Sequence, residues 1–113
     1  MWAVEVVARR RPTSESARHQ CSVARGELIG MLDDLGITDY RLIEVERPRG
    51  STRPIFDLHP AHQVLGIGTE VVDVTWMQID TLAQQPWKIY PSLDALREDW
   101  SVIRDWLTGE EIG

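Results

Sequence analysis

Apolar residues recur along this chain with two different periods, which predict a mixture of helices and strands. Between residues 21 and 35 they are three or four positions apart, which indicates one face of an α-helix. These positions are Cys21, Ala24, Leu28, Leu32 and Leu35. Gly36 follows at the place where a glycine commonly ends a helix, so we expect the helix to stop there.

A second helical pattern lies near the C-terminus. Ser92 is a suitable N-cap, and Asp94 falls in the first turn, where a carboxylate is favoured. Apolar residues then follow helical spacing at Leu93, Leu96, Trp100, Ile103 and Leu107. We therefore expect an amphipathic helix over residues 92–107, with an acidic outer face.

The remaining patterned segments are rich in β-branched and aromatic residues and predict strands. The single strands are expected at residues 2–9, 40–46, 55–58 and 87–90. Residues 61–77 predict a hairpin with Gly66 and Gly68 near its turn. This order of elements is typical of one α+β domain, and we expect residues 1–113 to form it.

The predicted hairpin brings a histidine opposite an aspartate. If its turn is centred between Ile67 and Gly68, His62 faces Asp73 across the two strands. Directly opposed residues point to the same face of a sheet, with Cβ atoms about 4.5–5.5 Å apart. At that separation a carboxylate can hold an imidazole by one ring nitrogen.

Cys21 is the only cysteine and opens the predicted helix. Free N–H groups at a helix start lower the pKa of a thiol and can stabilise an oxyanion. We therefore predict a triad in which Cys21 attacks a carbonyl, His62 transfers the proton and Asp73 orients the ring. The competing interpretation begins the helix near Ser14 or Ser16, which makes Cys21 a small core residue in mid-helix.

Two segments resemble papain-like and transglutaminase-like cysteine enzymes. Residues 21–37, CSVARGELIGMLDDLGI, are similar to the nucleophile helix of these enzymes, and residues 62–78, HQVLGIGTEVVDVTWMQ, to their His–Asp hairpin. The segment VVDVTWMQ resembles the V-D-x-T-x-x-Q pattern of the papain-fold toxin branch, which includes glutamine deamidases of bacterial toxins. The resemblance implies a small core in which the nucleophile helix packs on an antiparallel sheet.

The same resemblance implies a cysteine-dependent amide hydrolase that needs no cofactor. Its substrate would be a protein or peptide carrying a carboxamide, with glutamine deamidation as the expected reaction and peptide cleavage as the nearest enzymatic alternative. Gln78 matches the last position of the pattern, and Gln20 is a second accessory candidate. Papain has a glutamine oxyanion donor before its nucleophile, but this chain has Glu15 there, so the resemblance assigns no such donor.

Charge suggests a non-enzymatic alternative. The net charge is −6, and residues 57–113 carry ten acidic side chains against three basic ones. This distribution argues against bulk binding of nucleic acid, although arginines cluster over residues 9–11 and 47–53. It favours an acidic interaction module of the inhibitor or immunity type, whose protein partner would contact the C-terminal helix.

Further features bear on metal binding and location. His59 and His62, together with Asp57, form a loose set of metal ligands that Pro60 interrupts, so we expect no metal. The sequence has no apolar run long enough to cross a membrane and no signal-peptide pattern at its start. These features predict a cytoplasmic protein with no membrane partner, or a domain of a delivered toxin.

Overall fold

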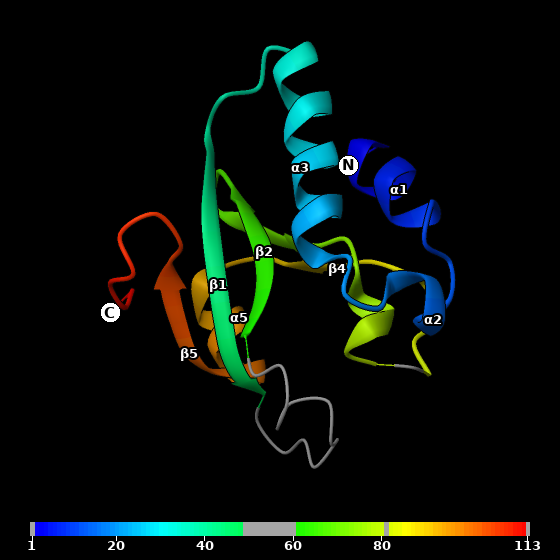
Figure 1. Cartoon of the computed structure of the whole chain (residues 1–113). Coiled ribbons are helices and arrows are strands. Elements are labelled where there is room, and N and C mark those ends of the chain that lie inside the picture. The colour runs from blue at the N-terminus through cyan, green and yellow to red at the C-terminus, as the bar shows by residue number, and fades with distance from the viewer. Residues whose placement is uncertain (1, 49–60, 81, 113) are drawn as a thin grey trace.

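The computed structural model describes residues 2–48, 61–80 and 82–112. These residues form a five-stranded antiparallel sheet with helices packed against it (Figure 1). In chain order the elements are α1 (Trp2–Arg9), α2 (Ser14–Ala17), α3 (Cys21–Asp34), β1 (Tyr40–Pro48), β2 (Ala61–Ile67), β3 (Glu70–Asp73), η1 (Trp76–Gln78), β4 (Lys88–Tyr90), α5 (Leu93–Asp99) and β5 (Trp100–Asp105). The strands lie in the order β4-β3-β2-β1-β5. The expected α+β class, with an antiparallel sheet, is confirmed at this level.

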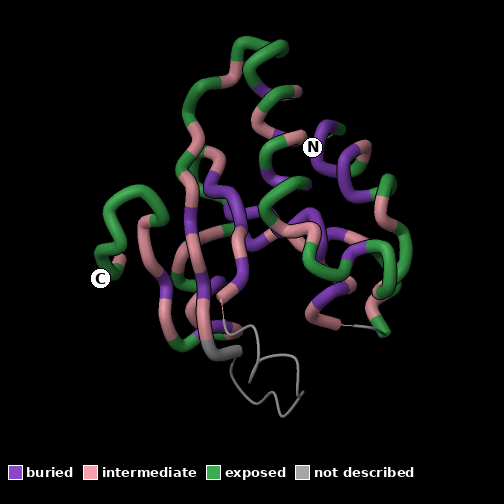
Figure 2. Tube along the Cα trace, viewed as in Figure 1, coloured by how far each residue is buried: buried purple, intermediate pink, exposed green. Residues whose placement is uncertain are grey.

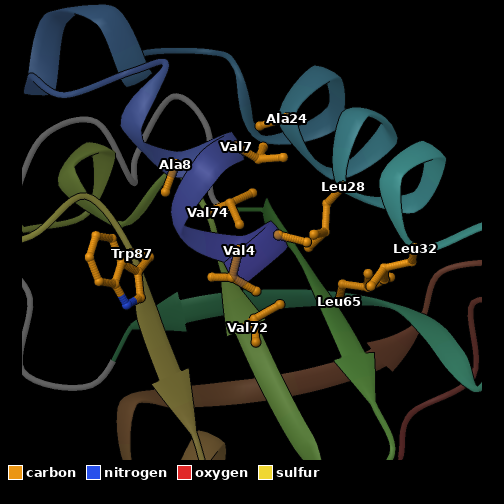
Figure 3. Close-up of a cluster of buried hydrophobic side chains, with 11 residues drawn as sticks. Val4, Val7, Ala8, Ala24, Leu28, Leu32, Leu65, Val72, Val74 and Trp87 are labelled. Carbon is orange, nitrogen blue, oxygen red and sulfur yellow. The ribbon is translucent and has the colours of Figure 1, made fainter. Parts of the chain in front are cut away.

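The first hydrophobic core joins α1 and α3 to the sheet (Figure 3). The predicted stripe of α3 is its contribution, since Ala24, Leu28 and Leu32 are fully buried. The strands add Leu65 and Val72, which the same cluster contains. The three-and-four spacing therefore identified the packed face of α3 correctly except at Leu35, which follows the helix and is 55% exposed. This packing fixes the helix over the sheet.

The second core lies on the opposite face of the sheet, under α5. Val64 and Val71, the neighbours of Leu65 and Val72 along their strands, belong to this cluster together with Leu96 of α5. The assignment follows from the two-residue period of a strand, which sends successive side chains to opposite faces. In Figure 2 buried residues are accordingly concentrated along the central strands, with exposed residues at the turn that follows α3.

Residues 2–9 form helix α1 rather than the expected strand. Val4, Val7 and Ala8 are fully buried on one side of the helix, whereas Trp2 is 64% exposed. Valine favours strands in general, but such propensity is weak where tertiary packing competes with it. Here α3 offers an apolar surface that one helical face of this segment matches.

The C-terminal helix is shorter than expected. Ser92 caps it as predicted, since its Oγ accepts a hydrogen bond from the N–H of Ala95 at 3.2 Å, but α5 ends at Asp99. Residues Trp100–Asp105 form β5, which pairs with β1. Trp100 and Ile103 are buried in this strand, as they would also be on a helical face, so the apolar spacing did not distinguish the two structures. The edge of β1 offers backbone N–H and C=O groups as hydrogen-bond partners, and pairing with them makes residues 100–105 a strand and not a helix.

The β2–β3 hairpin has a two-residue turn, Gly68–Thr69, and pairs Ile67 with Glu70. Gly68 has φ +60°, a conformation that glycine adopts without strain. The register is thus two residues away from the predicted one. A shift of two keeps every side chain on its face, so His62 and Asp73 share a face as diagonal neighbours and are not directly opposed.

Several other predictions are confirmed. Helix α3 begins at Cys21, and Gly36 follows its end with φ +75°. The strands expected at residues 40–46 and 87–90 correspond to β1 and β4. The strand expected at residues 55–58 lies outside the described residues. Among the helices that the structure describes, none combines the length and apolar character needed to cross a membrane.

Replacing Leu28 with alanine tests the packing of α3. Leu28 is fully buried between α1 and the sheet, so Leu28→Ala should lower the free energy of unfolding by about 2–5 kcal/mol. Urea denaturation measures the loss. Val23→Ala, at a position 53% exposed on the same helix, is the matched control and should change stability by less than about 0.5 kcal/mol. Equal losses in the two variants would contradict this orientation of α3.

Candidate active site

A break between two helices places Cys21 at a helix start. Thr13 caps α2 by accepting a hydrogen bond from the N–H of Ser16 at 3.0 Å, but this short helix ends at Ala17. His19 then has φ +59°, a left-handed conformation that interrupts the helix. Cys21 is therefore the first residue of α3 and is half-buried, so the mid-helix interpretation is wrong.

The first turn of α3 presents backbone donors beside the sulfur. Gln20 is the N-cap residue, and its carbonyl accepts the N–H of Ala24 at 2.8 Å. The first N–H groups of a helix have no acceptor within it. The Gln20 side-chain Oε1 is directed away to Arg11, whose Nε donates to it at 3.4 Å. The helix thus brings partial positive charge to Cys21.

The imidazole of His62 is held by Asp73 inside the protein. His62 Nε2 and Asp73 Oδ2 are 2.7 Å apart, with His62 1% exposed and Asp73 fully buried. Asp73 Oδ1 accepts the backbone N–H of Thr75 at 3.0 Å, which fixes the carboxylate. Trp100 stacks on the imidazole, with ring centroids 5.6 Å apart and planes 12° from parallel. Both members of the pair are therefore held in a fixed orientation.

Because Nε2 of His62 faces Asp73, Nδ1 is the ring nitrogen that can interact with Cys21. Nδ1 is buried and makes no hydrogen bond of regular geometry among the described residues. The Cys21 thiol nevertheless lies close enough to the ring to interact with it through hydrogen bonding and charge. Such loose contacts are common in active sites that contain no substrate. The structure thus brings the three predicted residues together.

The sulfur meets the sheet where two strands separate. Pairing between β2 and β3 stops at Leu65 and Val72, and β3 ends at Asp73. The backbone of Gln63, which lies beyond this ladder, is close enough to the Cys21 thiol to help lower its pKa. The sequence did not indicate this donor, because a backbone N–H has no residue signature. It is a candidate for the unassigned oxyanion donor.

These contacts favour charge separation between sulfur and ring. Burial raises the pKa of Cys21, but the hydrogen bond and charge of His62, with the Gln63 backbone, outweigh it and lower the pKa below its usual value. Burial lowers the pKa of His62, but Asp73 and Cys21 outweigh it and raise this pKa to about 10. The raised pKa keeps His62 protonated at neutral pH, and the lowered pKa of Cys21 favours its thiolate, which is the nucleophilic form.

The two accessory candidates occupy different places. Gln78 is buried in η1, and its N–H donates to the carbonyl of Thr75 at 2.9 Å, so this short helix follows the Asp73 turn directly. Gln20 interacts with Arg11, as described above. Neither arrangement tests a catalytic role, which stays a prediction for both residues. In the alternative metal set, Asp57 and His59 lie outside the described residues, and His62 is bound to Asp73.

Comparison of the chain with protein-family models, with curated proteins and with solved structures finds no match. The resemblance to papain-like enzymes therefore stays an expectation based on the sequence segments. Functional inference depends on the geometry of the site.

The reactivity of Cys21 should persist at unusually low pH. Because the thiol pKa is lowered, the rate of alkylation by iodoacetamide should reach its plateau at a lower pH than for an ordinary thiol, which slows about tenfold per pH unit below its own pKa. His62→Gln removes the imidazolium and should move the midpoint of the profile to higher pH. Identical profiles for the two proteins would contradict the pairing of Cys21 with His62.

The carboxylate of Asp73 should maintain the charge of His62. Asp73→Asn retains the shape of the side chain but removes its charge, so the pKa of His62 should fall from about 10 by at least about one pH unit. NMR titration of the ring resonances measures this change. Asp80→Asn, which alters an exposed turn where Asp80 Oδ1 accepts the N–H of Leu82, is the control and should leave the titration unchanged.

Proposed function

We propose that this chain is a cysteine-dependent amide hydrolase in which Cys21, His62 and Asp73 form the catalytic triad. The observation that carries the proposal is the position of one buried imidazole between two partners. Its Nε2 is 2.7 Å from the Asp73 carboxylate, and the ring also interacts with the thiol at the first residue of α3. This is the arrangement that nucleophilic catalysis by a thiol requires.

In the proposed first step, the Cys21 thiolate attacks the carbon of a carboxamide. Negative charge then develops on the carbonyl oxygen, where N–H groups at the start of α3 and of Gln63 are suitable donors. The His62 imidazolium donates its proton to the leaving ammonia or amine as the C–N bond breaks, which leaves a thioester on Cys21. In the second step His62 removes a proton from water as the water oxygen attacks the thioester. The C–S bond then breaks, which restores the Cys21 thiolate.

Protein glutamine is the substrate group we favour, with a peptide bond as the alternative. The preference is based on the V-D-x-T-x-x-Q pattern of Asp73, Thr75 and Gln78. The N–H of Thr75 binds the Asp73 carboxylate, and Thr75 Oγ1 lies 3.5 Å from the same oxygen. These contacts support the choice of glutamine because two positions of the pattern, Asp73 and Thr75, interact with each other at the triad.

The acidic interaction module has less support. Its expected surface was a long C-terminal helix, but α5 covers only Leu93–Asp99. Three acids in this part of the chain also form ion pairs. They are Asp94–Arg97 at 2.7 Å, Asp99–Lys88 at 2.6 Å and Asp105–Arg41 at 3.0 Å. Because Arg41 lies outside residues 57–113, its pair with Asp105 lowers the uncompensated negative charge that this part could use to steer a basic partner.

Cys21→Ser should lower the rate of amide hydrolysis by about 10³-fold or more, because the hydroxyl is a far weaker nucleophile here. The assay incubates the protein with a library of glutamine-containing peptides. Released ammonia and the mass shift of deamidation report one reaction, and new peptide termini report cleavage. Val23→Ala should retain full activity. Turnover that survives in Cys21→Ser, or a wild-type protein inactive in both readouts, would contradict the proposal.

A further inference from the structure

Arg25 is a buried cation one helical turn after Cys21. The residue is 4% exposed, and its Nη1 donates to the carbonyls of Ile43 at 3.3 Å and Val64 at 3.4 Å. The indole of Trp106 lies against the guanidinium, with 5.1 Å between Cζ and the ring centroid. No Asp or Glu of the described residues forms an ion pair with it.

A guanidinium keeps its proton in proteins, so burial without a counter-charge is costly. The titratable groups that interact with Arg25 are Cys21, on its own helix, and Glu44, on β1. Residues four apart on a helix are neighbours, with Cβ atoms about 5–6 Å apart. Cys21 and Glu44 are both partly buried, and the interaction of Arg25 with Cys21 is the stronger of the two. The thiolate is the anion best placed to balance Arg25.

We propose that Arg25 is the second cation of the thiolate site, beside His62, and holds Cys21 in its ionised form. The inference builds on the proposed function, since it concerns the nucleophile of that reaction. Arg25 touches neither the reacting bond nor the proton in transit, so it is a positioning residue. The Ile43 and Val64 carbonyls and the Trp106 ring fix its guanidinium in place.

The charges of the buried site support this assignment. Cys21 and Asp73 contribute one negative charge each in the active form, and His62 and Arg25 contribute one positive charge each. With Arg25 present the four groups are neutral together. Without it, a desolvated site would carry excess negative charge, and protonation of the thiolate is the simplest way to relieve it.

Two substitutions at Arg25 separate its charge from its size. In Arg25→Met the alkylation midpoint of Cys21 should rise by about one pH unit, so the rate below the wild-type midpoint should fall about tenfold while the alkaline plateau is unchanged. Arg25→Lys keeps a charge and should restore most of the reactivity. Arg41→Met removes an exposed arginine that is paired with Asp105, and this control should behave as wild type. A folded Arg25→Met protein with the wild-type midpoint would overturn the proposal.

A second measurement leaves Arg25 intact, in case Arg25→Met does not fold. In the wild type, the NMR resonance of the Arg25 Nε–H should shift as Cys21 titrates, and in Cys21→Ser that shift should vanish. A resonance that does not respond to the titration in the wild type would overturn the proposal.

The two proposals fail in different ways. If Arg25→Met raises the alkylation midpoint but the wild-type protein hydrolyses no amide, the charge pairing is supported and the hydrolase function is rejected. An active enzyme whose alkylation profile is unchanged by Arg25→Met would remove only the role of Arg25.

Discussion

The buried hydrogen bond between His62 and Asp73 is the contact on which the site depends. Loss of either partner would leave a polar group without compensation in the interior, which is more costly than the bond itself is stabilising. The bond also joins β2 to the last residue of β3, beyond the point where their backbone pairing stops. Side chains thus continue the attachment of the two strands beyond their backbone ladder.

The position of the sulfur depends in turn on how α3 is held. Its apolar face packs on α1 and the sheet, and Glu27 on another face accepts Arg10 at 2.8 Å and Arg11 at 2.5 Å. Hydrogen bonds from Arg11 and Arg10 hold the pKa of Glu27 at about 2, so this carboxylate is charged at any ordinary pH. Arg11 also reaches Gln20, and the segment before α3 is thereby attached to the helix that it precedes.

The sequence predicted the structure correctly where the spacing of apolar residues, or the even or odd register of a strand pair, decides it. The limits of α3 follow from its apolar stripe and Gly36, and the shared face of His62 and Asp73 is preserved under any even change of register. The prediction failed at residues 2–9 and 100–105, where the same apolar positions suit a helix or a strand and the neighbouring element decides. The Gln63 backbone and the buried Arg25 depend on where β3 leaves β2, which no local pattern specifies.

The stacking of Trp100 on His62 has a consequence for how the protein matures. Trp100 begins β5, which is reached only after every other element of the site has been synthesised. The contacts among Cys21, His62 and Trp100 are also far apart in sequence, so they form together with the whole core and not in an early local nucleus. A nascent or partly unfolded chain therefore lacks the contacts that lower the pKa of the Cys21 thiol, and these contacts arise only when folding is complete.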